Sequence, residues 1–273
     1  MLMTVGEKAG VYGYHRDGLR WIETEKAGMR LAPVRASRES GQYLGYLLFE
    51  RFAETGVHQH LGPAFSYFLR GGLTDFQGTA RAGEMGINLE GATHTAISYG
   101  TTLAASRLEA PVIYPSEDAV RGEVLHTGAT PGEIENLAPE ILPDLNLDLE
   151  GIPWAPLRWR GVQRRMVFDY RETAFDRRNV QLRLLPGTRT PPFETTAPVD
   201  VFVVGGDLSA GGETVGSGGF MVIEAGARVE LSTRYGALAI FWAEGPTRPE
   251  EGLPCLMGFE GRRTMRSAGA AAG

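Results

Sequence analysis

Two of the five histidines stand two positions apart in the segment VHQH, as His58 and His60. In an extended strand, residues i and i+2 project from the same face, so both imidazoles would point in one direction. His94 follows after a predicted hairpin and one more strand, and a strand that returns through a barrel can place it opposite the first two. Neutral imidazoles bind Fe, Zn, Cu and Ni, and three of them leave coordination positions open. The spacing therefore makes His58, His60 and His94 candidate ligands of one divalent metal.

Other residues near these histidines leave alternatives open. An isolated His-x-His pair also arises among histidines of a core or a surface, so its neighbours must decide. Glu90 lies four residues before His94, on the same face of a regular strand. It could be a solvated rim glutamate, a partner that orients a metal-bound imidazole, or a replacement ligand. His15 is expected at the surface or at an interface, and His126, at the start of the linker, is not expected to be a ligand.

The elements that would carry these residues are predicted to be strands. Apolar residues alternate with polar ones in short runs such as SYFLRGGL and LAIFWAEG. Alternation of this kind is typical of half-buried strands that pair as hairpins. The 37 glycines and 16 prolines fall between the runs and supply the turns. The fold class is therefore predicted as all-β.

The chain also contains two copies of one unit. Trp21 and Gly28 recur as Trp154 and Gly161, and similar segments follow in each half, so the unit repeats after roughly 133–136 residues. A repeat of this length indicates a duplicated domain. We expect an N-terminal arm at 1–20, a first domain at 21–114, an acidic Pro-rich linker at 115–153, a second domain at 154–262 and a flexible tail at 263–273.

Two segments resemble the motifs of the cupin family. GVHQHLGPAFSYFLRGG (56–72) is similar to G(x)5HxH(x)3–4E(x)6G, and GEMGINLEGATHTAIS (83–98) is similar to G(x)5PxG(x)2H(x)3N. His58 and His60 match the histidines of the first motif, and His94 matches that of the second. The resemblance covers residues 21–110 and, in degenerate form, 154–245. It implies two tandem cupin barrels, that is, double-stranded β-helix or jelly-roll barrels.

The sequence departs from the family pattern at two positions. Ala64 or Phe65 stands where the family has a glutamate ligand, and Leu89 stands in place of the second motif's proline. Without the glutamate, a three-histidine site remains. This pattern is similar to the cupin group that contains the ChrR-type domain, acetylacetone dioxygenase and 2,4′-dihydroxyacetophenone dioxygenase.

In the second copy, Pro191, Phe193 and about Val229 correspond to His58, His60 and His94. None of the three can bind a metal. The second domain is therefore expected to keep the fold without the site, either as a structural partner or as a metal-free ligand pocket.

The strand after HQH has two faces, and its register leaves open which one lines the pocket. One face carries Phe65, Tyr67 and Leu69, and the other carries Ser66, Phe68 and Arg70. Arg70 or Arg107 could hold an anionic substrate oxygen, or lie at the surface. The candidate catalytic residues are Glu90, Tyr67, Arg70 and Arg107.

A ferrous ion on three neutral imidazoles would keep its full charge, bind an anionic bidentate substrate and leave a position for O2. The resemblance implies a non-haem Fe(II) dioxygenase that cleaves a carbon–carbon bond of a small diketone or hydroxyketone. Zn and Ni are the alternative metals. The alternative functions are a non-catalytic metal- or ligand-binding regulator of ChrR type and a zinc-dependent hydrolase or isomerase.

Charge and composition limit the classes of partner that the protein can bind. A formal net charge of −6 opposes nucleic acid or an anionic membrane as partner. No apolar run reaches the ~20 residues of a membrane-spanning helix, and Cys255 is the only cysteine, so a cytoplasmic location is expected. By analogy with other cupins, a homodimer is expected.

Overall fold

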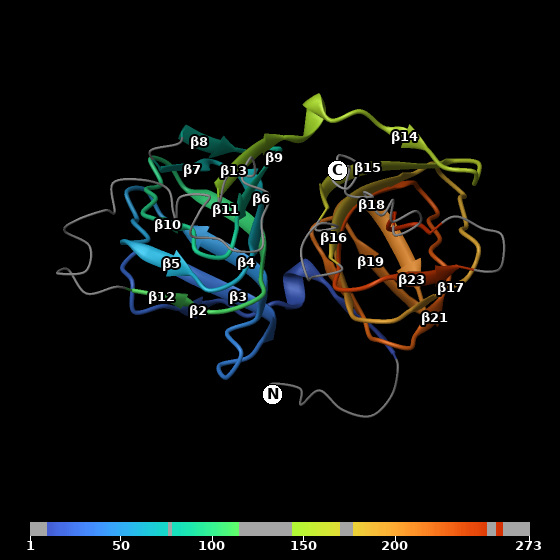
Figure 1. The fold of residues 1–273 in the computed structure, drawn as a ribbon, viewed down its shortest axis with the longest axis horizontal. Coiled ribbons are helices and arrows are strands. Elements are labelled where there is room, and N and C mark those ends of the chain that lie inside the picture. Colours follow the sequence, from blue (N-terminus) through green and yellow to red (C-terminus); the bar gives the residue numbers. More distant parts are fainter. Residues whose placement is uncertain (1–9, 76–77, 115–143, 170–176, 250–254, 259–273) are drawn as a thin grey trace, which may run out of the picture.

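The computed structural model describes residues 10–75, 78–114, 144–169, 177–249 and 255–258. These residues form strands paired in antiparallel fashion and two short 3-10 turns, η1 (Arg16–Gly18) and η3 (Leu149–Gly151). The predicted all-β class is confirmed. No helix in the described part of the chain has the length and apolarity needed to cross a membrane. Figure 1 shows two β-sheet bodies side by side, which we call the N-terminal and C-terminal units.

The N-terminal unit contains two sheets and a hairpin. Its large sheet has the order β13 (Asp144–Asp148), β9 (Glu84–Asn88), β6 (Ala64–Arg70), β11 (Thr102–Leu108), β4 (Tyr43–Phe49), β3 (Met29–Ala36) and β2 (Ile22–Glu23). Its small sheet has the order β10 (Thr93–His94), β5 (His58–His60) and β12 (Val112–Ile113). The hairpin pairs β7 (Gly72–Asp75) with β8 (Gly78–Arg81).

The C-terminal unit repeats this arrangement. Its large sheet has the order β1 (Val11–Tyr14), β20 (Phe220–Ile223), β18 (Val199–Ala210), β22 (Ala237–Ala243), β16 (Arg178–Leu184), β15 (Val162–Asp169) and β14 (Ala155–Pro156), and β19 (Glu213–Gly216) pairs with β18. Its small sheet has the order β21 (Arg228–Val229), β17 (Phe193–Thr195) and β23 (Thr247–Pro249).

The pairing registers fix how the two copies correspond. His58 pairs with His94 across β5 and β10, and Phe193 pairs with Val229 across β17 and β21. The offset is 135 residues for both pairs, so Phe193 corresponds to His58 and Thr195 to His60. The expected equivalents Pro191 and Phe193 were therefore wrong by two positions, whereas Val229 is the equivalent of His94.

Each large sheet ends in a strand from outside the domain expected for it. β1, from the expected arm, pairs with β20 of the C-terminal unit, residue for residue from Val11–Ile223 to Tyr14–Phe220. β13, from the expected linker, pairs with β9 of the N-terminal unit. Residues 115–143 of that linker and the tail at 263–273 lie outside the described residues.

Because β1 covers an edge strand, a charge on its inner face should destabilise the fold. Val11 packs against the apolar cluster of the C-terminal unit. We expect Val11→Asp to lower the free energy of unfolding by about 1–3 kcal/mol, measured by urea denaturation. Gly18→Ala is the control, since an added Cβ there has no atom within 4 Å. Equal midpoints for the two variants would contradict the proposed contribution of β1.

The two units share an apolar interface formed by the outward faces of their large sheets. Residues of one buried cluster come from both units, among them Tyr46, Ile87, Phe202 and Phe220. The Tyr46 ring packs edge-on against Phe220 with ring centroids 5.0 Å apart, and its hydroxyl donates to the carbonyl of Gly218. The C-terminal unit therefore packs on the outside of the N-terminal sheet.

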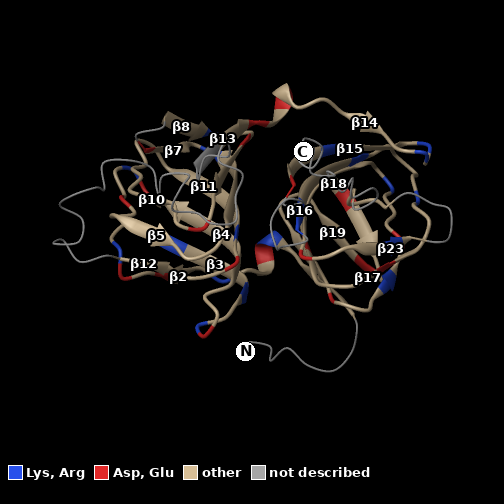
Figure 2. Cartoon of the chain, viewed as in Figure 1, with Lys and Arg blue, Asp and Glu red and all other residues tan. Residues whose placement is uncertain are grey.

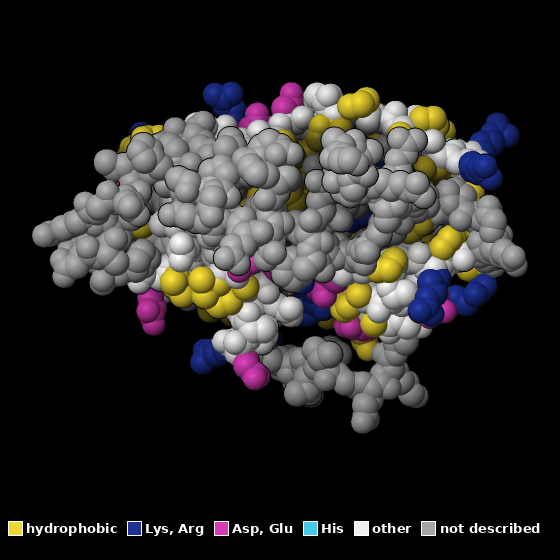
Figure 3. All heavy atoms as spheres, in the orientation of Figure 1, with side chains coloured by type: hydrophobic (Ala, Val, Ile, Leu, Met, Phe, Trp, Pro, Cys, Tyr) yellow, Lys and Arg dark blue, Asp and Glu magenta, His cyan; other side chains and the backbone are white. Residues whose placement is uncertain are grey.

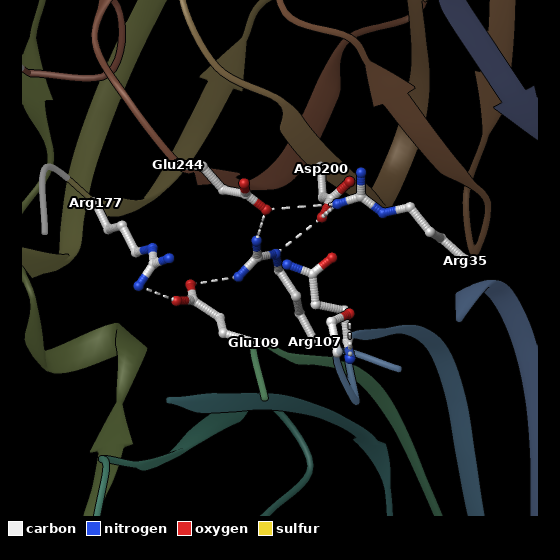
Figure 4. A network of polar contacts seen from close by, with 8 residues as sticks. Arg35, Arg107, Glu109, Arg177, Asp200 and Glu244 are labelled. Atoms are coloured by element: carbon white, nitrogen blue, oxygen red, sulfur yellow. Dashed lines mark hydrogen bonds and ion pairs between the residues drawn. The ribbon is translucent and has the colours of Figure 1, made fainter. Parts of the chain in front are cut away.

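A network of ion pairs lies within this interface (Figure 4). The Arg107 guanidinium is buried and donates to Glu109, to Glu244 and, over 2.8 Å, to Asp200. Arg35 donates to the same Asp200 carboxylate over 2.7 Å. Burial alone would lower the pKa of Arg107, but the three carboxylates hold it above its ordinary value. Arg107 therefore joins the two units.

The surface combines charges of both signs with a few apolar residues. Figure 2 shows Lys, Arg, Asp and Glu distributed over both units and between them. Figure 3 shows hydrophobic side chains at the surface of the N-terminal unit, on the side where Figure 1 places β2 and β12. Ile22 and Ile113 of these strands are 51% and 43% exposed. The expected homodimer stays a prediction.

Candidate metal centre

The small sheet of the N-terminal unit places three histidines on one face. His58 and His60 alternate with Gln59 along β5, and β10 brings His94 opposite His58. All three imidazole side chains are buried. The Gln59 amide points the other way and donates to the carbonyl of Gly91 over 3.3 Å. The two-residue period of the strand therefore directs both imidazoles of β5 to the same side as His94.

The three imidazoles converge on one point. One ring nitrogen from each lies within 4.8 Å of those of the other two. The ring centroids of His58 and His94 are 4.6 Å apart, and Nε2 of His60 lies 3.2 Å from Nε2 of His94. Metal–imidazole bonds of ~2.0–2.1 Å place neighbouring ligand nitrogens about 3 Å apart. The distance between His60 and His94 matches this value, and the third nitrogen lies near enough to complete a site for a single metal ion.

Hydrogen bonds fix the proton positions on two of the rings. His58 Nδ1 donates to the carbonyl of Gly56 over 2.9 Å, and His94 Nδ1 lies 3.2 Å from Oδ2 of Asp75. A nitrogen that donates carries the proton, so Nε2 of each ring presents its lone pair to the centre. Without a cation, the contact between His60 and His94 requires a proton on His60 Nε2. Metal binding at Nε2 requires the other neutral tautomer of His60, with its proton on Nδ1.

Electrostatics keep the imidazoles of His58 and His60 neutral. Burial lowers the pKa of His58 to about 4, and the charges of His94 and Lys26 act in the same direction. Burial also lowers the pKa of His60 well below its usual range, and the charges of His58 and His94 act in the same direction. Because a metal binds the neutral form of imidazole, these two side chains need not lose a proton near pH 7.

The low pKa of His58 predicts a pH dependence of stability for the metal-free protein. Below pH 6.5 the unfolded chain binds a proton at His58, whereas the folded protein does so only near pH 4. The contribution of His58 is therefore complete above pH 6.5 and is lost as the pH falls to about 4, by at most about 3 kcal/mol. Melting temperatures between pH 7 and 4.5 should fall more steeply for the wild type than for His58→Gln. Parallel curves would contradict this assignment.

Two of the candidate catalytic residues face away from the histidines. Tyr67 belongs to the cluster between the units, and its ring centroid lies 6.2 Å from that of Phe202. Arg107 is part of the interface network. Phe65 and Leu69 also face the C-terminal unit, whereas Phe68 packs within the N-terminal unit. The face of β6 that carries Phe68 is therefore turned into the N-terminal unit, and the face that carries Phe65, Tyr67 and Leu69 is turned to the C-terminal unit.

The other two candidates are exposed. Glu90 lies at the surface, and its carboxylate is not among the ligand atoms that converge. Arg70 is exposed at the end of β6. Among the residues singled out from the sequence, the structure therefore brings together only His58, His60 and His94.

Three further side chains near the histidines were not expected from the sequence. Asp75 contacts His94, as described above. The Tyr114 ring centroid lies 5.9 Å from that of His58, and the Lys26 ammonium lies 3.9 Å from the centre of the Tyr114 ring. They come from a hairpin, a strand end and a turn, so no spacing along the chain indicates their proximity.

The corresponding positions of the C-terminal unit hold Phe193, Thr195 and Val229, all of which are buried. The Thr195 hydroxyl donates to the carbonyl of Glu224 over 2.6 Å. Phenylalanine and valine offer no ligand atom, so the C-terminal unit lacks the histidine set at these positions.

Comparison with known proteins gives a family match for the first part of the chain. Residues 10–108 match the family model of the ChrR cupin-like domain. This part of the chain is similar to that domain. The resemblance seen in its histidine motifs is thereby confirmed. No functionally curated protein sequence matches the chain.

Solved structures extend the similarity of fold over most of the chain. A proposed dioxygenase from Nostoc punctiforme PCC 73102 aligns with a TM-score of 0.65 at 9% identity, covering 85% of this chain and 82% of that one. An oxalate decarboxylase–formate complex from Lactobacillus farciminis gives a TM-score of 0.60 at 11% identity, covering 90% and 88%. A Bacillus subtilis oxalate decarboxylase variant gives 0.57 at 10% identity, covering 89% and 78%. At such identities the likeness shows a shared cupin fold.

Proposed function

We propose that the N-terminal cupin domain binds one divalent transition metal through His58, His60 and His94, and that with Fe(II) it is a dioxygenase. The observation that carries this proposal is the convergence of three buried imidazoles with no carboxylate among the ligand atoms. Three neutral ligands leave the charge of the cation uncompensated and leave coordination positions for substrate and O2.

The substrate class is inferred from charge. An anionic, bidentate oxygen donor such as an enolised β-diketone or hydroxyketone complements an uncompensated cation. Lys26 adds a positive charge close enough to lower the pKa of His58. The inward face of β6 carries the Phe68 ring, packed in an apolar cluster, and the Ser66 hydroxyl, which lies 2.8 Å from that of Ser106.

A bound ferrous ion would supply Lewis acidity and electron transfer to O2. The protein's own residues would hold the imidazoles in one tautomer and orient the substrate oxygens. Cleavage of the carbon–carbon bond would give two fragments, each with one of the two atoms of O2. The dioxygenase description of the Nostoc neighbour agrees with this reaction class, and the name oxalate decarboxylase shows that cupin proteins also act on a small dicarboxylate.

Oxygen uptake tests the proposed reaction. Protein loaded with Fe(II) is screened against β-diketones and hydroxyacetophenones in an oxygen electrode, with product analysis by mass spectrometry after reaction under ¹⁸O2. We expect one O2 consumed per substrate cleaved, labelled oxygen in both fragments, and no uptake with zinc. Turnover with zinc under anaerobic conditions would instead support a hydrolase or isomerase.

A second candidate is a non-catalytic regulator, favoured by the match of residues 10–108 to the ChrR cupin-like domain. Such a protein would bind metal but turn over none of the substrates. It would also capture a protein partner in a metal-dependent manner. Pull-down with metal-loaded protein and with the His58→Ala/His60→Ala variant separates this candidate from the enzyme.

A further inference from the structure

Asp75 stands directly behind one of the three histidines. Its side chain is 12% exposed, and its Oδ2 lies 3.2 Å from Nδ1 of His94. The carboxylate is held there by the backbone, since Thr74 and Ile97 exchange two hydrogen bonds of 2.9 Å. These bonds tie the end of β7 to the segment that follows His94. The hairpin β7–β8 therefore carries a half-buried carboxylate to the outer side of the site.

The equivalent hairpin of the C-terminal unit, β18–β19, shows that the hairpin fold does not depend on this carboxylate. With the offset of 135 residues, Thr74 and Thr79 correspond to Ser209 and Thr214. The hydroxyls of each pair lie 2.8 Å apart, and Ser209 exchanges backbone hydrogen bonds with Ser232 as Thr74 does with Ile97. The same hairpin thus forms in both units.

The two hairpins differ at the position next to the centre. Ala210 occupies the position of Asp75, and Val229 occupies that of His94. The carboxylate is present in the unit that has the histidines and absent from the unit that lacks them. Since the β18–β19 hairpin forms with alanine at this position, the hairpin fold does not require Asp75.

Among the described residues, the converging ligand atoms include no carboxylate. Ala64 and Phe65, which stand at the glutamate position of the family motif, are both buried and apolar. A cation bound by three neutral imidazoles in a buried site would therefore lack a countercharge among its ligands. Asp75 is placed to supply that charge through the His94 ring.

We propose that Asp75 is the positioning residue of the metal centre: it fixes the Nδ1–H tautomer of His94 and supplies the negative charge that the ligands lack. This inference rests on the proposed metal function. A carboxylate behind the imidazole holds the ring orientation and increases the basicity of Nε2. Because the charge lies one residue away from the metal, all positions not taken by histidine stay open to substrate.

Titration with Co(II) tests the role of Asp75 by a readout other than turnover. Affinity is measured by competition with a chelator, and the ligand field by the visible absorption of the bound cobalt. Asp75→Asn keeps an acceptor for the Nδ1 proton but removes the charge, so we expect about tenfold weaker binding and shifted visible bands. Asp75→Ala removes both and should weaken binding by up to about a hundredfold. Asp75→Glu should recover part of the loss.

Asp207→Asn in the C-terminal unit is the matched control. Asp207 accepts backbone hydrogen bonds from Arg234 and Tyr235, so its loss should affect thermal stability and leave Co(II) affinity unchanged. Thermal melts of every variant establish that each is folded at the assay temperature. If Asp75→Ala is unfolded, the near-isosteric Asp75→Asn alone provides the test.

The outcomes separate this inference from the proposed function. Unchanged affinity and spectrum in Asp75→Asn and Asp75→Ala, with binding lost in His94→Gln, would overturn the role of Asp75 and leave the metal site intact. A wild type that binds no Co(II) would overturn both. If the Asp75 variants lose Co(II) affinity as expected but the Fe(II) protein takes up no oxygen, the role of Asp75 is supported and the dioxygenase proposal is contradicted.

Discussion

Replacing Arg107 with methionine is expected to lower the free energy of unfolding by about 3–5 kcal/mol. The substitution would remove the cation that Asp200, Glu109 and Glu244 share and leave these three carboxylates with Arg35 and Arg177 alone. Asp200 is 1% exposed, so water cannot replace the lost partner without opening the interface. Chemical denaturation followed by intrinsic fluorescence measures the loss.

The exposed pair of Arg189 and Glu230 provides the control for this prediction. The Arg189 side chain is 67% exposed, so Arg189→Met should cost less than about 1 kcal/mol. Arg107→Met should also retain full metal stoichiometry at temperatures where it is folded. A variant that stays as stable as the wild type but loses turnover would contradict the structural role and restore Arg107 as a candidate for substrate binding.

Replacing His94 with glutamine is expected to weaken zinc binding by at least about a hundredfold. Structural zinc sites bind with ~10–16 kcal/mol in total, so one ligand of a three-histidine site contributes on the order of 3 kcal/mol or more. Competition with a fluorescent zinc chelator measures the affinity. The exposed His15 is the matched control, and His15→Gln should bind zinc like the wild type.

An equal affinity in His94→Gln and in the wild type would contradict the three-histidine assignment. Equal losses in His15→Gln and His94→Gln would indicate nonspecific binding to surface histidines. Only a loss confined to the histidines of the centre supports the geometry described for the N-terminal unit.

Local patterns were sufficient for the strands and for the three histidines. The alternation along β5 and β6 follows from the pleat of a strand, which also directs His58 and His60 to one side. The approach of His94 was correctly anticipated, because the motif around it resembles the second cupin motif. These features depend on neighbours along the chain or on a known motif.

The contacts between distant segments could not be predicted in this way. Asp75 meets His94 because a hairpin folds back on the segment after β10, and no spacing rule describes that approach. Arg107 alternates with inward-facing neighbours on β11, and the sequence alone gives no sign that its face meets the C-terminal unit. The prediction that Phe193 corresponds to His60 was wrong by two residues. Only the pairing of Phe193 with Val229 fixes the register of the second copy.

The strand exchange between the units had no sequence signal either. β1 lies in a segment that was expected to be an arm, yet it pairs along its whole length with β20. Strand pairing over more than two hundred residues depends on which edge the completed sheet leaves open. Neither the hydrophobic pattern of Val11–Tyr14 nor its composition contains that information.

Metal content tests the central claim most directly. Wild type and the His58→Ala/His60→Ala variant are purified from iron-supplemented cells and analysed by inductively coupled plasma mass spectrometry. We predict about one iron per wild-type chain and essentially none in the variant. Circular dichroism should show that both proteins are folded. Equal metal content in the two proteins, or none in either after reconstitution with Fe(II), would contradict a metal centre at these histidines.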